Sequence, residues 1–286
     1  MAIDEKYMAG EFYTLLTNNE TGKVAMMAAT QKKRQLDTIL AHFQDQRFEV
    51  KTLTRDLSPT YDWVGRINFM AATHVADKFH VLRQLFDSLE AVRIYYRQQL
   101  LAEKRKQQEQ IHAQANQNQS PKTVGNQDKR LENGETSLEL LARSIYLLYK
   151  KKDNWSVNQR ERAEVLFKHY PQIQKAYELS MSFRKWYSKD YISTKKDKQS
   201  VLANRHTRQN QLNDWYNQVE LAKVPEMLNF KALVQRNQGI ILNYFINGDT
   251  NAKAEALNGT IKKIITRNVN TRNIDFAHFR LKNFLS

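Results

Sequence analysis

The chain has 286 residues and is 41% hydrophobic, which is enough to fold around a core. It contains no apolar run of about eighteen residues that would predict a membrane span, and no charged-then-apolar leader that would predict a secretory signal. Cysteine is absent, which excludes disulfides, cysteine nucleophiles and thiolate metal sites, and leaves carboxylates and seven histidines as ligands for hard ions such as Mg²⁺ or Mn²⁺. The net charge of +15 favours a polyanionic partner, with nucleic acid ahead of an anionic membrane surface or a ribosomal setting.

The first eighty residues alternate between strand and helix patterns. Five strands are predicted, over residues 1–4, 11–17, 23–29, 48–54 and 72–77. Two helices are predicted between them, over residues 33–43 and after Pro59. The order β-β-β-α-β-α-β is that of an α/β protein with an RNase H-like mixed five-stranded sheet.

Two acidic residues occupy matching places in this sheet. In such a layout the first strand is central and pairs with the fourth, so the carboxyl ends of the two strands lie side by side. Asp4 ends the first predicted strand, and Asp56 follows the fourth. Because ligands gather at the carboxyl ends of central strands, we expect these two carboxylates to form part of a site.

The rest of the chain reads as helical. A long helix begins near Phe79 and turns polar, and residues 103–135 read as its solvated end and a mobile loop. Residues 136–248 have helical periodicity, with aromatic residues expected mainly in a core rather than as base-stacking platforms. The predicted domains are a core over 1–95, a polar helix end and flexible linker over 96–135, a helical insertion over 136–248, and C-terminal helices over 249–286 that complete the core.

The C-terminal segment carries a lone acid in a basic field. Glu255, Asn258 and Lys262 lie at positions i, i+3 and i+7 of a predicted helix and share one face. Residues 251–286 contain seven cations and only two anions. From the residues alone, Glu255 is equally well a surface side chain on a basic helix or part of a site.

Three segments resemble a known family. The stretch Arg-Asp-Leu-Ser-Pro-Thr-Tyr at 55–61, followed by Ala-Asp-Lys-Phe-His-Val at 76–81, resembles the region of the second catalytic aspartate in insertion-sequence transposases of the ISL-three family and ISAon-type elements. Ala-Glu-Ala-Leu-Asn-Gly-Thr-Ile-Lys at 254–262 is similar to the closing motif of that family, and Ala-Ile-Asp-Glu at 2–5 to its first-strand motif. Lys78 stands where the family pattern has arginine.

The resemblance implies a DDE transposase, with Asp4, Asp56 and Glu255 as the catalytic carboxylates and metal ligands. It also implies a helical insertion between the last strand and the helix that bears Glu255. In this reading two Mg²⁺ or Mn²⁺ ions about 3.5–4 Å apart would be held with Asp4 bridging both. Cations and an amide beyond Glu255 would contact DNA: Asn258, Lys262, Lys263, Arg267, Arg272 and Arg280.

Five other polar residues near the expected site are given lesser roles. Asp77 and His80 could suggest a metal pair, but the resemblance favours a structural role or a role behind the metal ligands. His74 is expected to pack within the sheet. Glu5 and Asp62 are expected to point away from the two aspartates.

The expected partners are transposon-end and target DNA, in a homodimer in the bacterial cytoplasm at the nucleoid, without a membrane. Family members usually carry a zinc ribbon or helix-turn-helix domain before the first aspartate, whereas three residues precede Asp4 here. A separate DNA-binding subunit or a truncated chain would each explain this difference. Two other readings remain: an inactive, domesticated DNA-binding protein on the same scaffold, and an RNase H-like nuclease without strand transfer.

Overall fold

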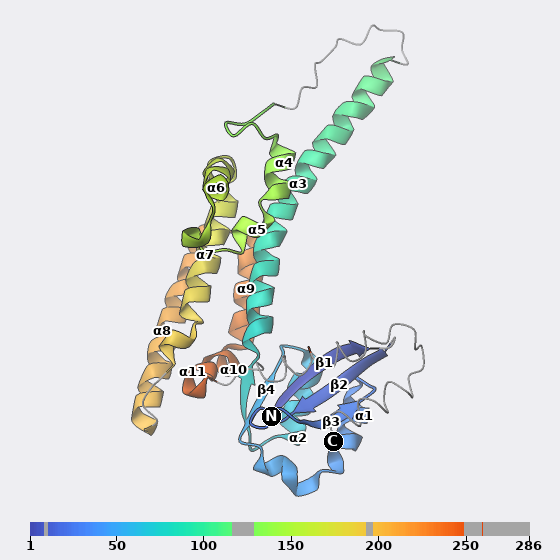
Figure 1. Cartoon of the computed structure of the whole chain (residues 1–286), viewed down its shortest axis with the longest axis vertical. Helices are drawn as coiled ribbons and strands as arrows, with labels where there is room; N and C mark the ends of the chain where they lie inside the picture. The colour runs from blue at the N-terminus through green and yellow to red at the C-terminus, as the bar shows by residue number, and fades with distance from the viewer. Residues whose placement is uncertain (9–10, 116–128, 193–196, 249–258, 260–286) are drawn as a thin grey trace. The chain divides into compact units, whose positions relative to one another are not determined.

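The computed structural model describes residues 1–8, 11–115, 129–192, 197–248 and 259 (Figure 1). The chain divides into two compact units. One unit comprises residues 1–82, 188–210 and the described residues from 234 onward, and the other comprises residues 83–187 and 211–233. The first unit contains the sheet and both aspartates of the expected site.

The sheet has the predicted topology. Its strands are β1 (Ala2–Met8), β2 (Glu11–Thr17), β3 (Val24–Ala28), β4 (Thr52–Arg55) and β5 (Thr73–Ala76). Their order is β3-β2-β1-β4-β5, in which β2 runs antiparallel to both of its neighbours and β1, β4 and β5 are parallel. The prediction of an RNase H-like mixed five-stranded sheet with β1 at its centre and beside β4 is therefore confirmed.

One face of the sheet is covered by two amphipathic helices, α1 (Lys33–Ala41) and α2 (Pro59–Asn68). Alternate residues of the strands and the apolar stripes of the helices meet in one cluster, because a strand places every second side chain on the same face. The members of the cluster are Ile3, Leu16, Met26, Ala28, Leu36, Leu40, Leu53, Tyr61, Val64 and Phe69. This packing fixes β1 and β4 against a common support.

Two predicted strand boundaries were wrong. β1 continues to Met8, well past Asp4, because its second half pairs with β2 alone. The fourth strand begins at Thr52 and not at residue 48, since a 3-10 helix, η1 (Gln44–Glu49), precedes it. Phe48 alternates with Val50 as a strand residue would, yet the Phe48 side chain is 52% exposed and packs on no sheet face.

Beyond the sheet the described chain is helical, as predicted. The α-helices are α3 (Lys78–Ala115), α4 (Ser137–Arg143), α5 (Ile145–Leu148), α6 (Val157–His169), α7 (Pro171–Trp186), α8 (Lys198–Ala222), α9 (Pro225–Arg236), α10 (Gln238–Leu242) and α11 (Tyr244–Asn247). Two 3-10 helices interrupt them, η2 (Lys152–Asn154) and η3 (Lys189–Tyr191). Thr136 and Ser156 begin α4 and α6 with capping boxes, which satisfy the first free backbone N–H groups of each helix.

Residues 129–136, at the end of the segment predicted as a linker, form a hydrogen-bonded turn. Arg130 and Thr136 form a β-bridge across a turn, and the buried Glu135 carboxylate bonds the guanidinium groups of Arg143 and Arg162. The two arginines satisfy a charge that would otherwise be costly to bury. This turn therefore belongs to the folded second unit.

Many aromatic residues of the helical region lie in the core, as expected, although Tyr146 is 75% exposed. The Phe183 ring packs against the rings of Trp186, Tyr187, Trp215 and Phe230, with centroid distances from 4.9 to 5.9 Å. All five side chains are buried. They contribute to the stability of the second unit and are not available as base-stacking platforms.

Candidate active site

Parallel pairing of β1 with β4 places Asp4 beside Asp56. The register pairs Ala2 with Thr54 and Ile3 with Arg55, so Asp4 and Asp56 are the residues that follow the last pair on the two sides. Asp4 does not end its strand as predicted, because β1 continues along β2. It is instead the first residue of β1 beyond the parallel pairing. The two carboxylates thus lie near each other at the open sheet edge, the place where the pairing of β1 with β4 ends.

The turn after β4 is built around Asp56. The Asp56 Oδ1 accepts a hydrogen bond from the backbone N–H of Ser58 at 2.8 Å. The Ser58 hydroxyl in turn accepts from Thr60 N–H at 3.2 Å and caps α2, with Pro59 in the first helical position. Serine at the cap and proline next to it are the residues that start helices best, which explains the spacing of this motif.

Burial destabilises the ionised forms of both aspartates. It raises the pKa of Asp4 and of Asp56, and this effect outweighs the hydrogen bonds that each carboxylate accepts from the backbone. The positive charge of His80 acts in the opposite direction on both. Two half-buried carboxylates with raised pKa values at one sheet edge form a site that a bound cation would stabilise.

His80 is held beside these carboxylates by Asp77. The His80 Nδ1 lies 2.7 Å from the Asp77 Oδ2, and the Asp77 side chain is 2% exposed. The other carboxylate oxygen of Asp77 accepts the backbone N–H of Phe79 at 3.0 Å, which caps α3. The bond to Asp77 is the main reason that the pKa of His80 is raised, and the charges of Asp4 and Asp56 add to it.

Of the neighbouring polar residues, Asp62 and His74 lie as expected, whereas the charge of Glu5, which was expected to point away, acts on Asp56 and adds to the rise of its pKa. The Glu5 carboxylate accepts a hydrogen bond from Gln31 at 2.5 Å. Asp62 forms an ion pair with the buried guanidinium of Arg55 at 2.5 Å. The His74 ring packs in the sheet region with its Nε2 3.1 Å from the Phe69 carbonyl oxygen. None of these contacts involves Asp4 or Asp56.

The end of the helical region is tied to the same sheet edge. The Asn243 side-chain amide donates to the carbonyl oxygen of His74 in β5 at 2.9 Å. The Lys78 ammonium donates to the Tyr244 hydroxyl at 3.1 Å and lies 4.8 Å from the centre of its ring. The sequence patterns gave no sign of these contacts, because the partners are 169 and 166 residues apart.

Similarity to known proteins is found at the level of the family. The family model of the ISL3 group of DDE transposases, described as a transposase, matches residues 1–282. The chain belongs to the DDE transposase family. Neither the curated proteins nor the solved structures give a match. Membership of this family implies transposase activity and DNA binding, and divalent metals are typical of its members.

Several predicted site residues of the transposase lie outside the described residues. These are Glu255, Asn258, Lys262, Lys263, Arg267, Arg272 and Arg280. Within the described residues, no group of three or more His, Cys, Asp and Glu side chains could hold a metal ion. In the same part of the chain, no helix is both long and apolar enough to cross a membrane.

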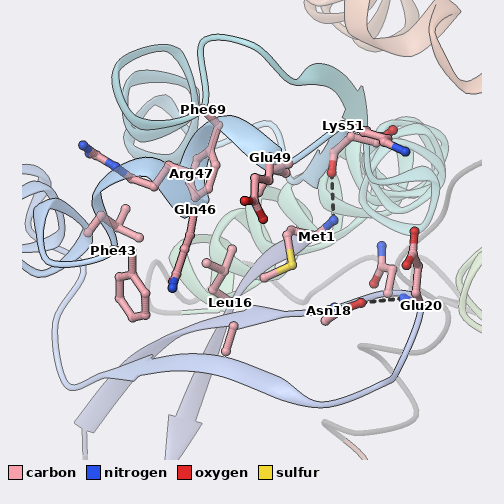
Figure 2. Close-up of a pocket in the computed structure, with 15 residues that line it drawn as sticks. Met1, Leu16, Asn18, Glu20, Phe43, Gln46, Arg47, Glu49, Lys51 and Phe69 are labelled. Atoms are coloured by element: carbon pink, nitrogen blue, oxygen red, sulfur yellow. Dashed lines mark hydrogen bonds between the residues drawn. The ribbon is translucent and has the colours of Figure 1, made fainter.

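A pocket of about 670 Å³ lies at the other end of the parallel strands of the transposase (Figure 2). It is lined by Met1, which precedes β1, and by Thr52, the first residue of β4. Charged side chains of both signs, from Arg47, Glu49 and Lys51, also line it. Neither aspartate of the site lines this pocket. The candidate active site is therefore the open edge at Asp4 and Asp56, and not this hollow.

The raised pKa of Asp56 predicts a stability change. Asp56→Asn is expected to raise the melting temperature of the metal-free transposase near neutral pH by about 2 °C. The ionised carboxylate costs folding free energy as the pH rises through its raised folded-state pKa, and below its unfolded-state pKa this cost is absent. The amide oxygen of Asn can keep the Ser58 hydrogen bond without the charge. Thermal denaturation in EDTA at neutral pH and near pH 4 measures the difference, which should shrink at the lower pH.

A matched variant separates this effect from a general effect of charge removal. Asp45→Asn removes an exposed carboxylate from η1 and should leave the melting temperature unchanged. Added Mn²⁺ should stabilise the wild-type protein more than Asp56→Asn, since a ligand stabilises only the state that binds it. A lower melting temperature for metal-free Asp56→Asn at neutral pH would contradict the prediction.

Proposed function

We propose that this chain cuts the ends of its own mobile element and joins them to target DNA in a divalent-metal-dependent reaction, with Asp4, Asp56 and Glu255 as the catalytic carboxylates. The observation that carries the proposal is the parallel register of β1 and β4, which puts Asp4 and Asp56 next to each other at an open sheet edge. Carboxylate oxygens are the ligands that Mg²⁺ and Mn²⁺ prefer.

The return of the chain to this edge supports Glu255 as the third carboxylate. Tyr244 is bonded to Lys78, which directly follows Asp77 near the two aspartates. Glu255 follows Tyr244 by 255 − 244 = 11 residues. A segment of that length spans at most about 40 Å, so Glu255 stays within reach of the sheet edge. This reach is compatible with Glu255 as the third ligand and so supports the proposal.

The chemistry needs the carboxylates to be ionised and held in place. Divalent cations, when bound by Asp4, Asp56 and Glu255, supply Lewis-acid activation of the attacking oxygen and of the scissile phosphate. Asp56 is held by the Ser58 N–H, and Asp4 by the N–H of Glu5. One side-chain amide and five cationic side chains of the C-terminal segment would bind the DNA backbone, which suits the net charge of +15. These groups are Asn258, Lys262, Lys263, Arg267, Arg272 and Arg280.

A cleavage assay tests the proposal directly. A supercoiled plasmid carrying the element with its flanking DNA is incubated with the purified protein in Mg²⁺, in Mn²⁺ and in EDTA. Nicked or linear product is expected with either metal and not with EDTA, and primer extension should map the cuts to the element ends. Pre-cut ends supplied with a target plasmid should be joined to it. Absence of cutting and joining in both metals would refute the proposed function.

A further inference from the structure

The His80 side chain is held in a fixed position near the open sheet edge, and it is not one of the three proposed metal ligands. The His80 ring is fixed through Nδ1 by Asp77, and Asp77 is itself fixed in two ways. Its backbone N–H donates to the Arg55 carbonyl at 2.6 Å, and its Oδ1 accepts the N–H of Phe79. The imidazole is thus tied to the end of β4, the residue before Asp56, rather than to a mobile surface segment.

The ring lies just beyond the carboxyl end of β5, which pairs in parallel with the end of β4 that leads to Asp56. With Nδ1 engaged, the second nitrogen, Nε2, remains for another contact, and the side chain is 27% exposed. The charge of His80 acts on Asp4 and on Asp56, and the charges of both act on His80. Asp77, in contrast, is almost fully buried and uses both carboxylate oxygens in hydrogen bonds. Of this pair, His80 is therefore the one that is exposed enough to contact a molecule bound near Asp4 and Asp56.

We propose that His80 positions the attacking water in the hydrolytic step, with Asp77 holding the ring. In the neutral tautomer set by Asp77, Nδ1–H donates to the carboxylate and Nε2 keeps a lone pair that accepts a hydrogen bond from the water. Cations held by Asp4 and Asp56 favour this neutral form, because like charges oppose protonation. The water oxygen forms the new bond to phosphorus and its proton passes to solvent, while the bond from phosphorus to the 3′-oxygen breaks and that oxygen takes up a proton from solvent to leave as a 3′-hydroxyl.

This role separates the two steps of the proposed reaction, on which it rests. Water has no tether and depends on hydrogen bonds for its orientation. The 3′-hydroxyl that attacks target DNA is held by the bound DNA strand, so it depends less on His80. Loss of the Nε2 contact should therefore slow cleavage much more than joining.

Two variants of His80 divide the contributions of its nitrogens. His80→Asn keeps an amide near Nδ1 that can bond Asp77 but has no group at the Nε2 position, and we expect cleavage to fall about 100-fold. Joining of pre-cut duplex oligonucleotides that carry the mapped end should fall less than about threefold, because the attacking 3′-hydroxyl is still positioned by the bound DNA strand. His80→Gln places an amide oxygen near Nε2 and should recover part of the lost cleavage.

The controls identify a purely structural effect. His74→Asn alters a histidine that packs at the sheet, so it should lower the melting temperature and reduce cleavage and joining by the same factor. If His80→Asn reduces both steps equally, or neither, the positioning role is overturned while the proposed function stands. If the wild-type protein neither cuts nor joins, the proposed function fails and this role fails with it.

Discussion

Asp56→Asn is expected to reduce DNA cleavage by at least about 1,000-fold, equivalent to about 4 kcal/mol of transition-state stabilisation. The substitution replaces a charged ligand with a neutral one in a site whose metal affinity depends on negative charge. The amide oxygen of the new asparagine can still accept the hydrogen bond from the Ser58 N–H, so the turn into α2 is kept. Single-turnover cleavage of the element-bearing plasmid in Mg²⁺ measures the loss, and Asp4→Asn should behave in the same way.

DNA binding gives the first control for this prediction. Binding to phosphates comes from cations elsewhere on the chain, so the affinity of Asp56→Asn for end DNA in EDTA should stay within about threefold of wild type, with the same dependence on salt. A parallel loss of binding and cleavage would show that the substitution had disturbed the fold rather than the chemistry.

The residue next to Asp4 gives the second control. Glu5 is an acid of the same strand whose carboxylate is bonded to Gln31, and it acts on Asp56 only through its charge. Glu5→Gln should therefore cut DNA at nearly the wild-type rate. Cleavage that survives Asp4→Asn but is lost in Glu5→Gln would mean that the ligand of β1 had been assigned to the wrong face of the strand.

The sheet and its two aspartates were predictable because both follow from local patterns and one topological rule. Alternating strands separated by helices define the strand order, and that order places the first strand beside the fourth. Once Ile3 and Arg55 are paired, Asp4 and Asp56 must be neighbours. The motif around Ser58 and Pro59 is also local, since it is the start of a helix.

Features that depend on distant pairing were not predictable from the same patterns. β1 extends to Met8 because β2 offers it a partner, and no signal within residues 1–8 reveals this extent. The contacts of Asn243 with β5 and of Tyr244 with Lys78 are single side-chain bonds across more than 160 residues. Such contacts leave no periodicity in the sequence, yet they bring the end of the helical region back to the active-site edge.

Glu255→Gln is the second substitution expected to have a large effect, again a loss of cleavage of about 1,000-fold or more. Glu255 lies outside the described residues, so its assignment depends on the family motif and on the anchoring of Tyr244 eleven residues earlier. If Glu255 is a ligand, its loss should also reduce the stabilisation of the protein by Mn²⁺, which a DNA-contacting residue would not affect.

Asp275→Asn is the matched control, because Asp275 is the other acid of the basic segment 251–286. It should cut DNA normally and keep the full stabilisation by Mn²⁺. If Glu255→Gln retains both properties, the third ligand must come from another acid. If it loses cleavage but keeps the stabilisation by Mn²⁺, Glu255 serves DNA binding or folding instead. Only the joint loss of cleavage and of the metal effect identifies Glu255 as the carboxylate that completes the site with Asp4 and Asp56.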